Sequence, residues 1–119
     1  MSDLKTEADI QAKIQIELSN LGVPMFRNNT GAYTTETGHY VRFGVGGVGG
    51  SDLIGITPVK ITEDMVGQTL GVFTAIEVKS KNGRATLEQR KFIQAVKNNH
   101  GLAGVAKSVN AALNIIKRK

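Results

Sequence analysis

Two ionisable side chains, Glu77 and Lys79, lie two positions apart near the end of an apolar segment. The apolar residues 71–76 predict a β-strand, and side chains two apart on a strand share one face. We expect this strand to be central and covered on both faces. A carboxylate and an ammonium buried there either form an ion pair or take part in chemistry, with the carboxylate binding a metal ion beside a catalytic lysine. These two residues alone favour the ion pair, because E-x-K triplets are common.

A second carboxylate, that of Asp52, stands where a glycine-rich stretch, residues 44–50, runs into a short apolar segment. Two carboxylates on neighbouring strands are the minimum set for holding one Mg²⁺. This ion prefers oxygen ligands, keeps several waters and often binds substrate phosphate as well. The order Asp52, Glu77, Lys79 therefore resembles the PD-(D/E)xK signature of nucleases, with Ser51 in place of the proline.

Two further polar side chains are predicted to face inward from the first turns of helices. Thr6 caps a helix that runs to about Asn20, and Glu7 lies on the apolar face of this helix. Thr86 opens a later helix as a capping box with Gln89. Each polar residue has an ordinary explanation, since Glu7 suits the helix dipole and Gln89 completes the cap. Their inward direction also allows them to reach a metal site, directly or through water.

The remaining elements follow from apolar periodicity and turn residues. They are a strand at 23–27, a hairpin with strands at 32–35 and 39–43, strands at 53–56 and 102–106, and a final helix from Val109 to Lys117. The polar stretch 57–70, with Glu63 and Asp64, is assigned to the surface. Because a strand–helix–strand unit spans residues 71–106, we expect a locally parallel pair within a mixed α/β sheet flanked by helices.

The glycine-rich stretch, called the glycine loop below, does not fit a nucleotide site. It lacks the G-K-[ST] of a P-loop and the G-x-G-x-x-G that precedes a helix in dinucleotide folds, so no nucleotide cofactor is expected. Two interpretations remain: a flexible flap near nucleic acid, or a tight connection that lets the backbone approach closely. We favour the flap.

Composition limits the classes of protein to consider. A chain of 119 residues suits one domain, spanning residues 1–119. There is no cysteine, and His39 and His100 are far apart, which argues against zinc-thiolate sites, histidine clusters and a Ser-His-Asp triad. No stretch approaches the length of a membrane span, and the polar N-terminus is unlike a signal peptide. We therefore expect an intracellular, cytoplasmic protein with no membrane association.

The net charge of +5 is unevenly distributed. Residues 79–119 contain ten basic residues and one acid, whereas residues 1–78 carry an excess of acids. A basic half beside a carboxylate cluster fits a polyanion whose phosphate is drawn to a metal, although a solvated lysine-rich surface would have the same composition. Aromatic residues are scarce, so contact with a duplex backbone is favoured over stacking on single strands.

The chain resembles the VRR-NUC (virus-type replication-repair nuclease) family of the restriction-endonuclease-like PD-(D/E)xK superfamily. The residues that carry the resemblance are Glu7, Gly50-Ser51-Asp52, Glu77-Val78-Lys79 and Gln89, together with Arg27-Asn28-Asn29 and Gly31. The resemblance implies an αβββαβ core and Mg²⁺- or Mn²⁺-dependent hydrolysis of DNA phosphodiester bonds. Small stand-alone members, many from phages, are similar to Holliday-junction resolvases and tend to be homodimers. This implies a bacterial or phage-infected cell and a role in DNA repair.

The groups present suggest a role for each residue. Asp52 and Glu77 would bind the cation, with the Val78 carbonyl as a third ligand. Lys79 would position the attacking water or stabilise charge on the phosphate. Glu7 and Gln89 would orient water, metal or lysine around them. The expected phosphate contacts are Arg27, Lys81, Arg84, Arg90 and Lys91.

Two other functions compete with a metal-dependent, structure-selective DNA endonuclease. One is a catalytically silent DNA-binding or interaction module with the same fold, and the other is a sheet protein with a buried ion pair. The intact set of Asp52, Glu77 and Lys79 favours the enzyme, because a DNA binder has no need of carboxylates that face phosphate. The ion-pair hypothesis leaves the basic half unexplained. The sequence leaves open which DNA structure, duplex or branched, is preferred.

Overall fold

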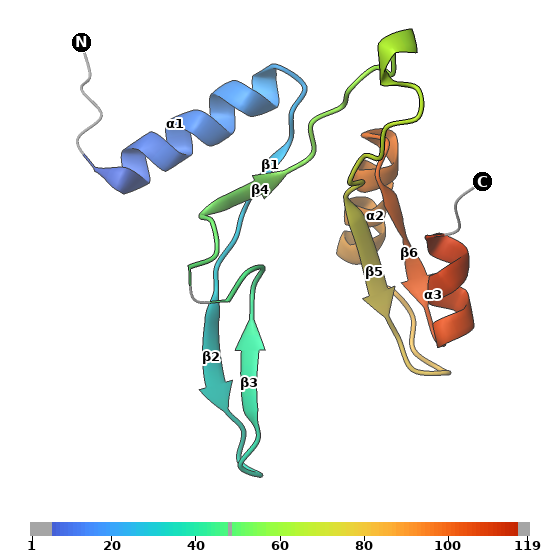
Figure 1. The fold of residues 1–119 in the computed structure, drawn as a ribbon. Coiled ribbons are helices and arrows are strands. Elements are labelled where there is room, and N and C mark those ends of the chain that lie inside the picture. The colour runs from blue at the N-terminus through green and yellow to red at the C-terminus, as the bar shows by residue number, and fades with distance from the viewer. Residues whose placement is uncertain (1–5, 48, 117–119) are drawn as a thin grey trace. The chain divides into compact units, whose positions relative to one another are not determined.

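The computed structural model describes residues 6–47 and 49–116. The chain divides into two compact units, with the boundary in the sequence between Thr57 and Pro58. The N-terminal unit contains α1 (Glu7–Asn20), β1 (Met25–Arg27), β2 (Gly31–Thr34), β3 (Tyr40–Phe43) and β4 (Leu53–Gly55) (Figure 1). The C-terminal unit contains the short 3-10 helix η1 (Glu63–Met65), then β5 (Thr74–Val78), α2 (Leu87–Asn98), β6 (Leu102–Ala106) and α3 (Val109–Ile115). The predicted order of strands and α-helices is confirmed, whereas η1, in the polar stretch 57–70, was not predicted. The predicted end of the last helix, Lys117, lies outside the described residues.

Helix α1 begins and ends where its sequence predicts. The Thr6 hydroxyl accepts a hydrogen bond from the Asp9 N–H at 3.1 Å, as a helix cap does. Past the last turn, Gly22 has a φ of 85°, a left-handed conformation that glycine adopts without strain. On the exposed surface, the hydrogen bond and charge of Lys13 hold the pKa of Glu17 below its ordinary value.

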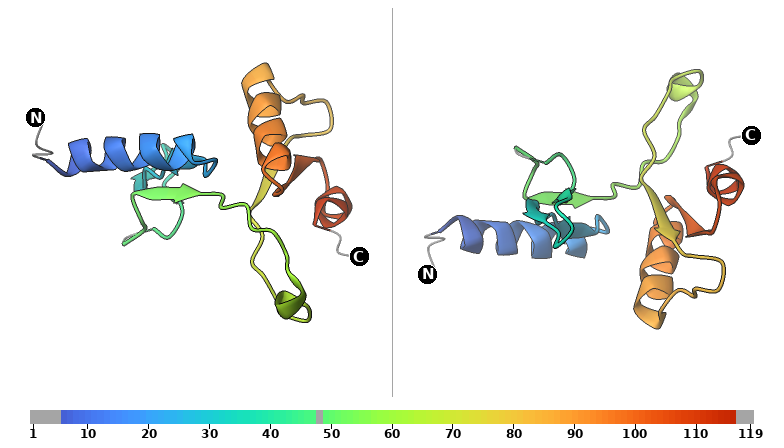
Figure 2. Two further views of the ribbon diagram at one scale, coloured as in Figure 1. Left: turned by 90° about the horizontal axis from the view of Figure 1, so that it is seen from above. Right: turned by 90° about the horizontal axis from the view of Figure 1, so that it is seen from below.

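The first and fourth strands of the N-terminal unit pair antiparallel and lie alongside α1 (Figures 1 and 2). Phe26 is opposite Ile54 in this pair, and the Gln15 side chain of α1 donates to the Met25 carbonyl at 3.0 Å. Ile56, just after β4, is buried. The predicted strands at 23–27 and 53–56 are therefore confirmed in shorter form.

The predicted hairpin is confirmed as the antiparallel pair of β2 and β3. Gly31 lies opposite Phe43, whose ring occupies the space that a Cβ at Gly31 would take. Tyr33 lies beside the same ring, with 6.4 Å between the ring centroids. The aromatic side chains therefore pack along one face of the hairpin.

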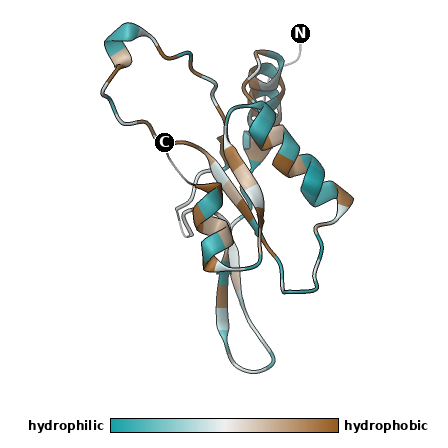
Figure 3. Cartoon of the chain, turned by 90° about the vertical axis from the view of Figure 1, so that its right-hand side faces the viewer, coloured by the Kyte–Doolittle hydropathy of each residue, from teal (hydrophilic) through white to brown (hydrophobic). Residues whose placement is uncertain are grey.

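The C-terminal unit is a strand–helix–strand arrangement with a parallel pair, as predicted. In this pair Thr74 is opposite Leu102 and Val78 is opposite Ala106. Helix α2 packs against both strands, and hydrophilic and hydrophobic residues alternate along it (Figure 3). Its Val96 is fully buried, and Ala103 and Ala106 of β6 are also buried. The described strands form three two-stranded sheets, two antiparallel and one parallel. The predicted α/β class is confirmed, and the joining of these pairs into one mixed sheet stays a prediction.

The C-terminal unit covers the two faces of β5 to different extents. Ala75 and Glu77 lie on the face that α2 covers, and both are half-buried. On the other face, α3 packs against β6, where Ile115 lies against Gly104. This helix has only 7 residues, and on β5 the side chains of Ile76 and Val78 are exposed. The C-terminal unit by itself therefore covers one face of the strand, and the expectation that both faces are covered stays a prediction for the whole chain.

The polar stretch after β4 agrees with its assignment to the surface. Glu63 and Asp64 are exposed, and the Asp64 carboxylate accepts a hydrogen bond from the Thr62 hydroxyl. Along the described ranges, no helix is long and apolar enough to cross a lipid bilayer.

Helix α2 is followed by a left-handed residue that is not a glycine. The residue with a left-handed backbone is His100, with a φ of 71°, although glycine is the usual residue in this conformation after a helix. The N–H of Gly101 donates to the Val96 carbonyl at 2.9 Å, which completes the turn. Gly101 is required for space, because a Cβ there would meet Val96 and the Phe73 carbonyl.

We expect His100→Gly to raise the free energy of unfolding by up to about 1 kcal/mol, because glycine adopts positive φ without the penalty of a side chain. Gly22→Ala is the matched control, since Gly22 holds the corresponding position after α1. It should lower the free energy of unfolding by about 1 kcal/mol. Denaturant unfolding of the two variants and the unsubstituted protein measures both changes, and destabilisation by His100→Gly would contradict the first.

Candidate active site

Three of the predicted site residues line one polar pocket in the N-terminal unit. The pocket has a volume of about 190 Å³ and gathers Glu7 from the first turn of α1, Arg27 from the end of β1 and Asp52 from the entrance to β4. Its other lining residues are Ala8, Gln11, Asn28 and Asn29. The pocket thus holds two carboxylates, a guanidinium and side-chain amides, which are groups able to bind a cation and a phosphate.

A less polar pocket of about 320 Å³ adjoins the first one. It shares Glu7, Gln11 and Asp52 with that pocket and adds Ile10, Ile14 and Leu53. The prediction that Glu7 lies on the apolar face of α1 agrees with this arrangement. Gln11 was missed in the sequence, although its position four residues after Glu7 places it on the same face of the helix.

Asn28 holds the backbone on both sides of Asp52. The Asn28 N–H donates to the Asp52 carbonyl at 2.8 Å, and the Asn28 side-chain amide donates to the Ser51 carbonyl at 2.9 Å. The first of these bonds comes directly after the pairing of Arg27 with Leu53 and so extends the β1–β4 pair. Asn28 therefore fixes the backbone at the point where Asp52, the predicted metal ligand, leads into β4.

In the C-terminal unit, Glu77 and Lys79 share one face of β5 and its extension, as predicted. The Lys79 Nζ lies 3.5 Å from Glu77 Oε2, and the two side chains are 20% and 31% exposed, respectively. Both charges are thus partly accessible to solvent and not fully buried. An ion pair of this kind stabilises a fold only slightly, so fold stability alone does not account for its presence.

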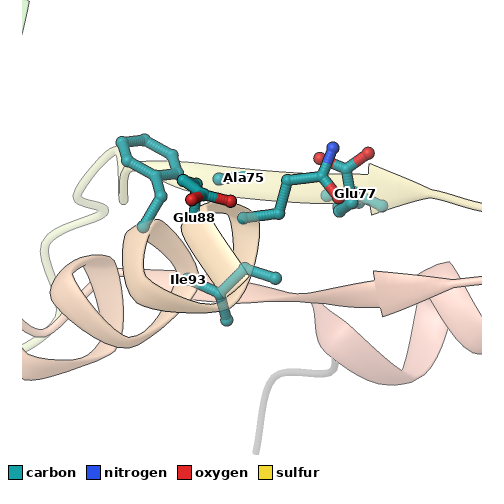
Figure 4. Close-up of a pocket in the computed structure, with 7 residues that line it drawn as sticks. Ala75, Glu77, Glu88 and Ile93 are labelled. Carbon is teal, nitrogen blue, oxygen red and sulfur yellow. The ribbon is translucent and has the colours of Figure 1, made fainter. Parts of the chain in front are cut away.

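The carboxylate of Glu77 opens into a pocket between β5 and α2 (Figure 4). The pocket has a volume of about 310 Å³, and Glu88 and Gln89 line it from the first turn of the helix. The predicted capping box is present: the Gln89 Oε1 accepts from the Thr86 N–H at 2.8 Å, and the Gln89 N–H donates to the Thr86 hydroxyl at 3.1 Å. The cap therefore uses the oxygen of the Gln89 amide and orients its nitrogen-bearing group beside the pocket. Glu88 was missed as a candidate because a capping box needs no such carboxylate.

The carbonyl of Val78, the third expected metal ligand, lies on the edge of β5 that faces away from β6. The Lys79 N–H donates to the Ala106 carbonyl at 3.0 Å, and the Phe73 carbonyl accepts from the Leu102 N–H at 2.9 Å. Backbone groups of alternate residues in a strand point to the same edge, so the odd-numbered residues face β6. The Val78 carbonyl consequently points to the opposite edge, where it is not used by this pair.

The expected phosphate contacts lie on the turn after β5 and on α2. Lys81, Arg84, Arg90 and Lys91 are all exposed. The turn is held by a residue that the sequence did not bring forward, because the Lys107 Nζ donates to the Lys81 carbonyl at 2.9 Å. Lys107 directly follows β6, as Lys79 follows β5, and this correspondence in a parallel pair is the signal that could have identified it.

The predicted residues thus form two groups, one in each unit. Glu7, Arg27 and Asp52 surround one pocket, and Glu77 and Gln89 line another, with Lys79 paired to Glu77. Among residues 6–47 and 49–116, no group of three or more His, Cys, Asp or Glu side chains could hold a metal ion. The convergence of Asp52 with Glu77 on one ion stays a prediction. In their chemistry the donors fit, since carboxylate and carbonyl oxygens are the ligands of hard cations such as Mg²⁺.

A family model described as the VRR-NUC domain matches residues 5–110, which is nearly the whole chain. A search of curated proteins and a search of solved structures found no match. A VRR-NUC domain indicates a restriction-endonuclease-like fold and a nuclease of the structure-specific DNA nuclease kind. DNA is therefore the substrate class, and nucleases with PD-(D/E)xK-like sites generally depend on a divalent metal ion.

We expect removal of the Glu77–Lys79 pair to cost little stability. Glu77→Gln and Lys79→Met should each lower the free energy of unfolding by less than about 1 kcal/mol, since the pair is partly solvated. Glu17→Gln, which breaks the exposed Lys13–Glu17 pair, is the control. A coupling energy of several kcal/mol between Glu77 and Lys79, measured by denaturant unfolding of a double-mutant cycle, would instead support the structural ion pair.

Proposed function

The chain belongs to the VRR-NUC family, and from this we propose that it is a divalent-metal-dependent endonuclease that hydrolyses phosphodiester bonds in branched DNA. We also propose that the two units act together as one nuclease domain, with Asp52 from the first and Glu77 from the second. The observation that supports the proposal most directly is the Glu77–Lys79 pair. It places a potential metal ligand and an ammonium 3.5 Å apart, both partly accessible.

In this proposal the cation is held by the carboxylates of Asp52 and Glu77 and by the carbonyl of Val78. When bound, Mg²⁺ or Mn²⁺ supplies Lewis-acid polarisation of the scissile phosphate and a more acidic water. Glu7 lines the same pocket as Asp52, and Gln89 lines the same pocket as Glu77. These two side chains would accept or donate hydrogen bonds that orient water and the ligands, as polar groups around metal sites commonly do.

Lys79 would act on the substrate phosphate and the attacking water. Its ammonium is kept beside Glu77 by charge, and its position directly after β5 is determined by the hydrogen bond from its N–H to Ala106. A positive group held in this way stabilises the negative charge that grows on the phosphate oxygens during hydrolysis. It can also donate a hydrogen bond that keeps the attacking water in line with the phosphorus.

The basic residues would bind the backbone of DNA. Lys81 and Arg84 lie on the turn that directly follows Lys79, and Arg90 and Lys91 lie on α2. Contacts to phosphate position DNA without reading its sequence, which suits an enzyme that recognises structure. Arg27 lines the pocket with Asp52 and is the phosphate contact proposed for the N-terminal unit.

We further propose that the enzyme acts as a homodimer on a four-way junction or another branched DNA. Two active sites related by two-fold symmetry match the symmetry of such a junction. Light scattering of the purified protein, alone and with a four-way junction, measures the assembly. A monomer in both samples would remove this part of the proposal without affecting the metal site.

Asp52→Ala and Glu77→Ala should each lower the rate of DNA cleavage by more than about a hundredfold, because each removes a metal ligand. Lys79→Met should lower it by about a hundredfold to a thousandfold while DNA affinity is retained. Cleavage is followed on duplex, flap, splayed-arm and four-way DNA with Mg²⁺ or Mn²⁺. Asp64→Ala is the control, because this exposed carboxylate is outside both pockets. This variant should cleave DNA as fast as the unsubstituted protein does.

Equal cleavage by Asp52→Ala and the unsubstituted protein would eliminate the assignment of the site. DNA binding without cleavage in either metal would support the catalytically silent module instead. Either result is distinguishable from misfolding if the thermal unfolding of each variant is measured in parallel.

Arg84→Ala should weaken binding to all the DNA structures to a similar extent. Loss of one phosphate contact also reduces the slope of log affinity against log salt concentration by about 1. Fluorescence anisotropy at several salt concentrations, in EDTA to prevent cleavage, measures both effects. Lys13→Ala, on the surface of α1, is the charge-matched control, and an equal change in the two variants would contradict a specific contact.

A further inference from the structure

The side chain of Asn28 uses its whole amide to join the beginning of the glycine loop to the residue that follows the loop. Its Oδ1 accepts from the Val45 N–H at 2.9 Å, and its Nδ2 donates to the Val45 carbonyl at 2.8 Å. The same Nδ2 donates to the Ser51 carbonyl at 2.9 Å. Val45 is near the beginning of the glycine loop, and Ser51 directly follows its end. One amide therefore brings the two ends of the loop together.

These bonds also restrict the position of Asp52. The peptide group before Asp52 is held through the Ser51 carbonyl, and the peptide group after it is held through its own carbonyl, which accepts from the Asn28 N–H at 2.8 Å. With both flanking peptide groups bound, the backbone of Asp52 cannot rotate freely. Asn28 therefore restrains the direction in which the Asp52 side chain leaves the backbone toward the pocket, while the side chain itself is exposed.

The glycines of the loop allow this close arrangement. Gly44 has a φ of 90°, and a Cβ there would meet the Asn29 carbonyl and Thr30. A Cβ at Gly50 would meet the Val45 carbonyl, one of the groups bound by Asn28. The loop described on either side of residue 48 is thus a tight connection at its ends, which favours the second of the two interpretations made from the sequence.

We propose that Asn28 is a positioning residue for the metal site: it orients Asp52 and ties the glycine loop to the strand that carries it. The inference rests on the proposed function for the metal, but the contacts themselves do not. Only a side chain that both donates and accepts can make these bonds, because Val45 offers both its N–H and its carbonyl. Aspartate has the same shape but lacks the donor, and its charge would face two carbonyl oxygens.

The experiment compares Asn28→Ala and Asn28→Asp with the unsubstituted protein by two measurements that need no catalysis. Hydrogen exchange by NMR reports the Val45 amide, which Asn28 protects. Electron paramagnetic resonance of added Mn²⁺ reports the affinity of the metal site. Asn20→Ala, an exposed asparagine at the end of α1, is the matched control, and Asp52→Ala is the reference for loss of a ligand.

We expect both Asn28 variants to exchange the Val45 amide faster and to bind Mn²⁺ about 10- to 100-fold more weakly, as when groups that orient a metal ligand are removed. Cleavage by these variants should recover at higher Mn²⁺ concentration, whereas cleavage by Asp52→Ala should not. Asn20→Ala should be unchanged in all three measurements. If Asn28→Ala fails to fold, the Asn28→Asp variant carries the test, with thermal unfolding as the check.

Faster exchange of Val45 with unchanged Mn²⁺ affinity would overturn the inference and leave the proposed function intact. Absence of Mn²⁺ binding by the unsubstituted protein would overturn both, and is distinguished by that sample alone. Cleavage that stays low at every Mn²⁺ concentration would also count against a positioning role, since it would make Asn28 indispensable to the reaction itself.

Discussion

A carboxylate that faces a DNA backbone repels it unless a cation lies between them, because both are negatively charged. In the proposed site, Glu7 and Asp52 around one pocket and Glu77 beside another would be such carboxylates. A site that binds DNA through a cation therefore needs oxygen atoms that the fold holds in constant positions. Such a site would also use Arg27 and Lys79, the two cationic side chains next to these acids. Both can bind a phosphate that the cation attracts.

The oxygens are positioned by hydrogen bonds at the ends of short strands. The described part of the chain buries few apolar residues, among them Ile56, Val96 and Ala103. Glu77 and Lys79 are placed by the parallel pairing of β5 with β6, which also leaves the Val78 carbonyl on the other edge. Asp52 is placed by Asn28, where the β1–β4 pair continues by one more bond. The side chains of Asp52, Glu77 and Lys79 are thus accessible to a ligand while hydrogen bonds hold their backbone in place.

Several parts of the fold could be predicted because their causes are local. Thr6 and Thr86 cap helices through bonds to residues three positions away, and such bonds need no distant partner. The sharing of a face by Glu77 and Lys79 follows from the geometry of a strand alone. The end of α2 was less accessible to sequence reasoning, because glycine is the usual left-handed residue and here the chain uses His100.

The sequence by itself determined the order of the elements, their caps, and the residue types able to hold a hard cation, since these depend on neighbours within a few positions. Only the tertiary structure decided which of them meet. It brought Glu7 to Asp52 across more than forty residues and joined Asn28 to both ends of the glycine loop. Such contacts depend on how strands pair and helices pack, and no local pattern of residues specifies that pairing.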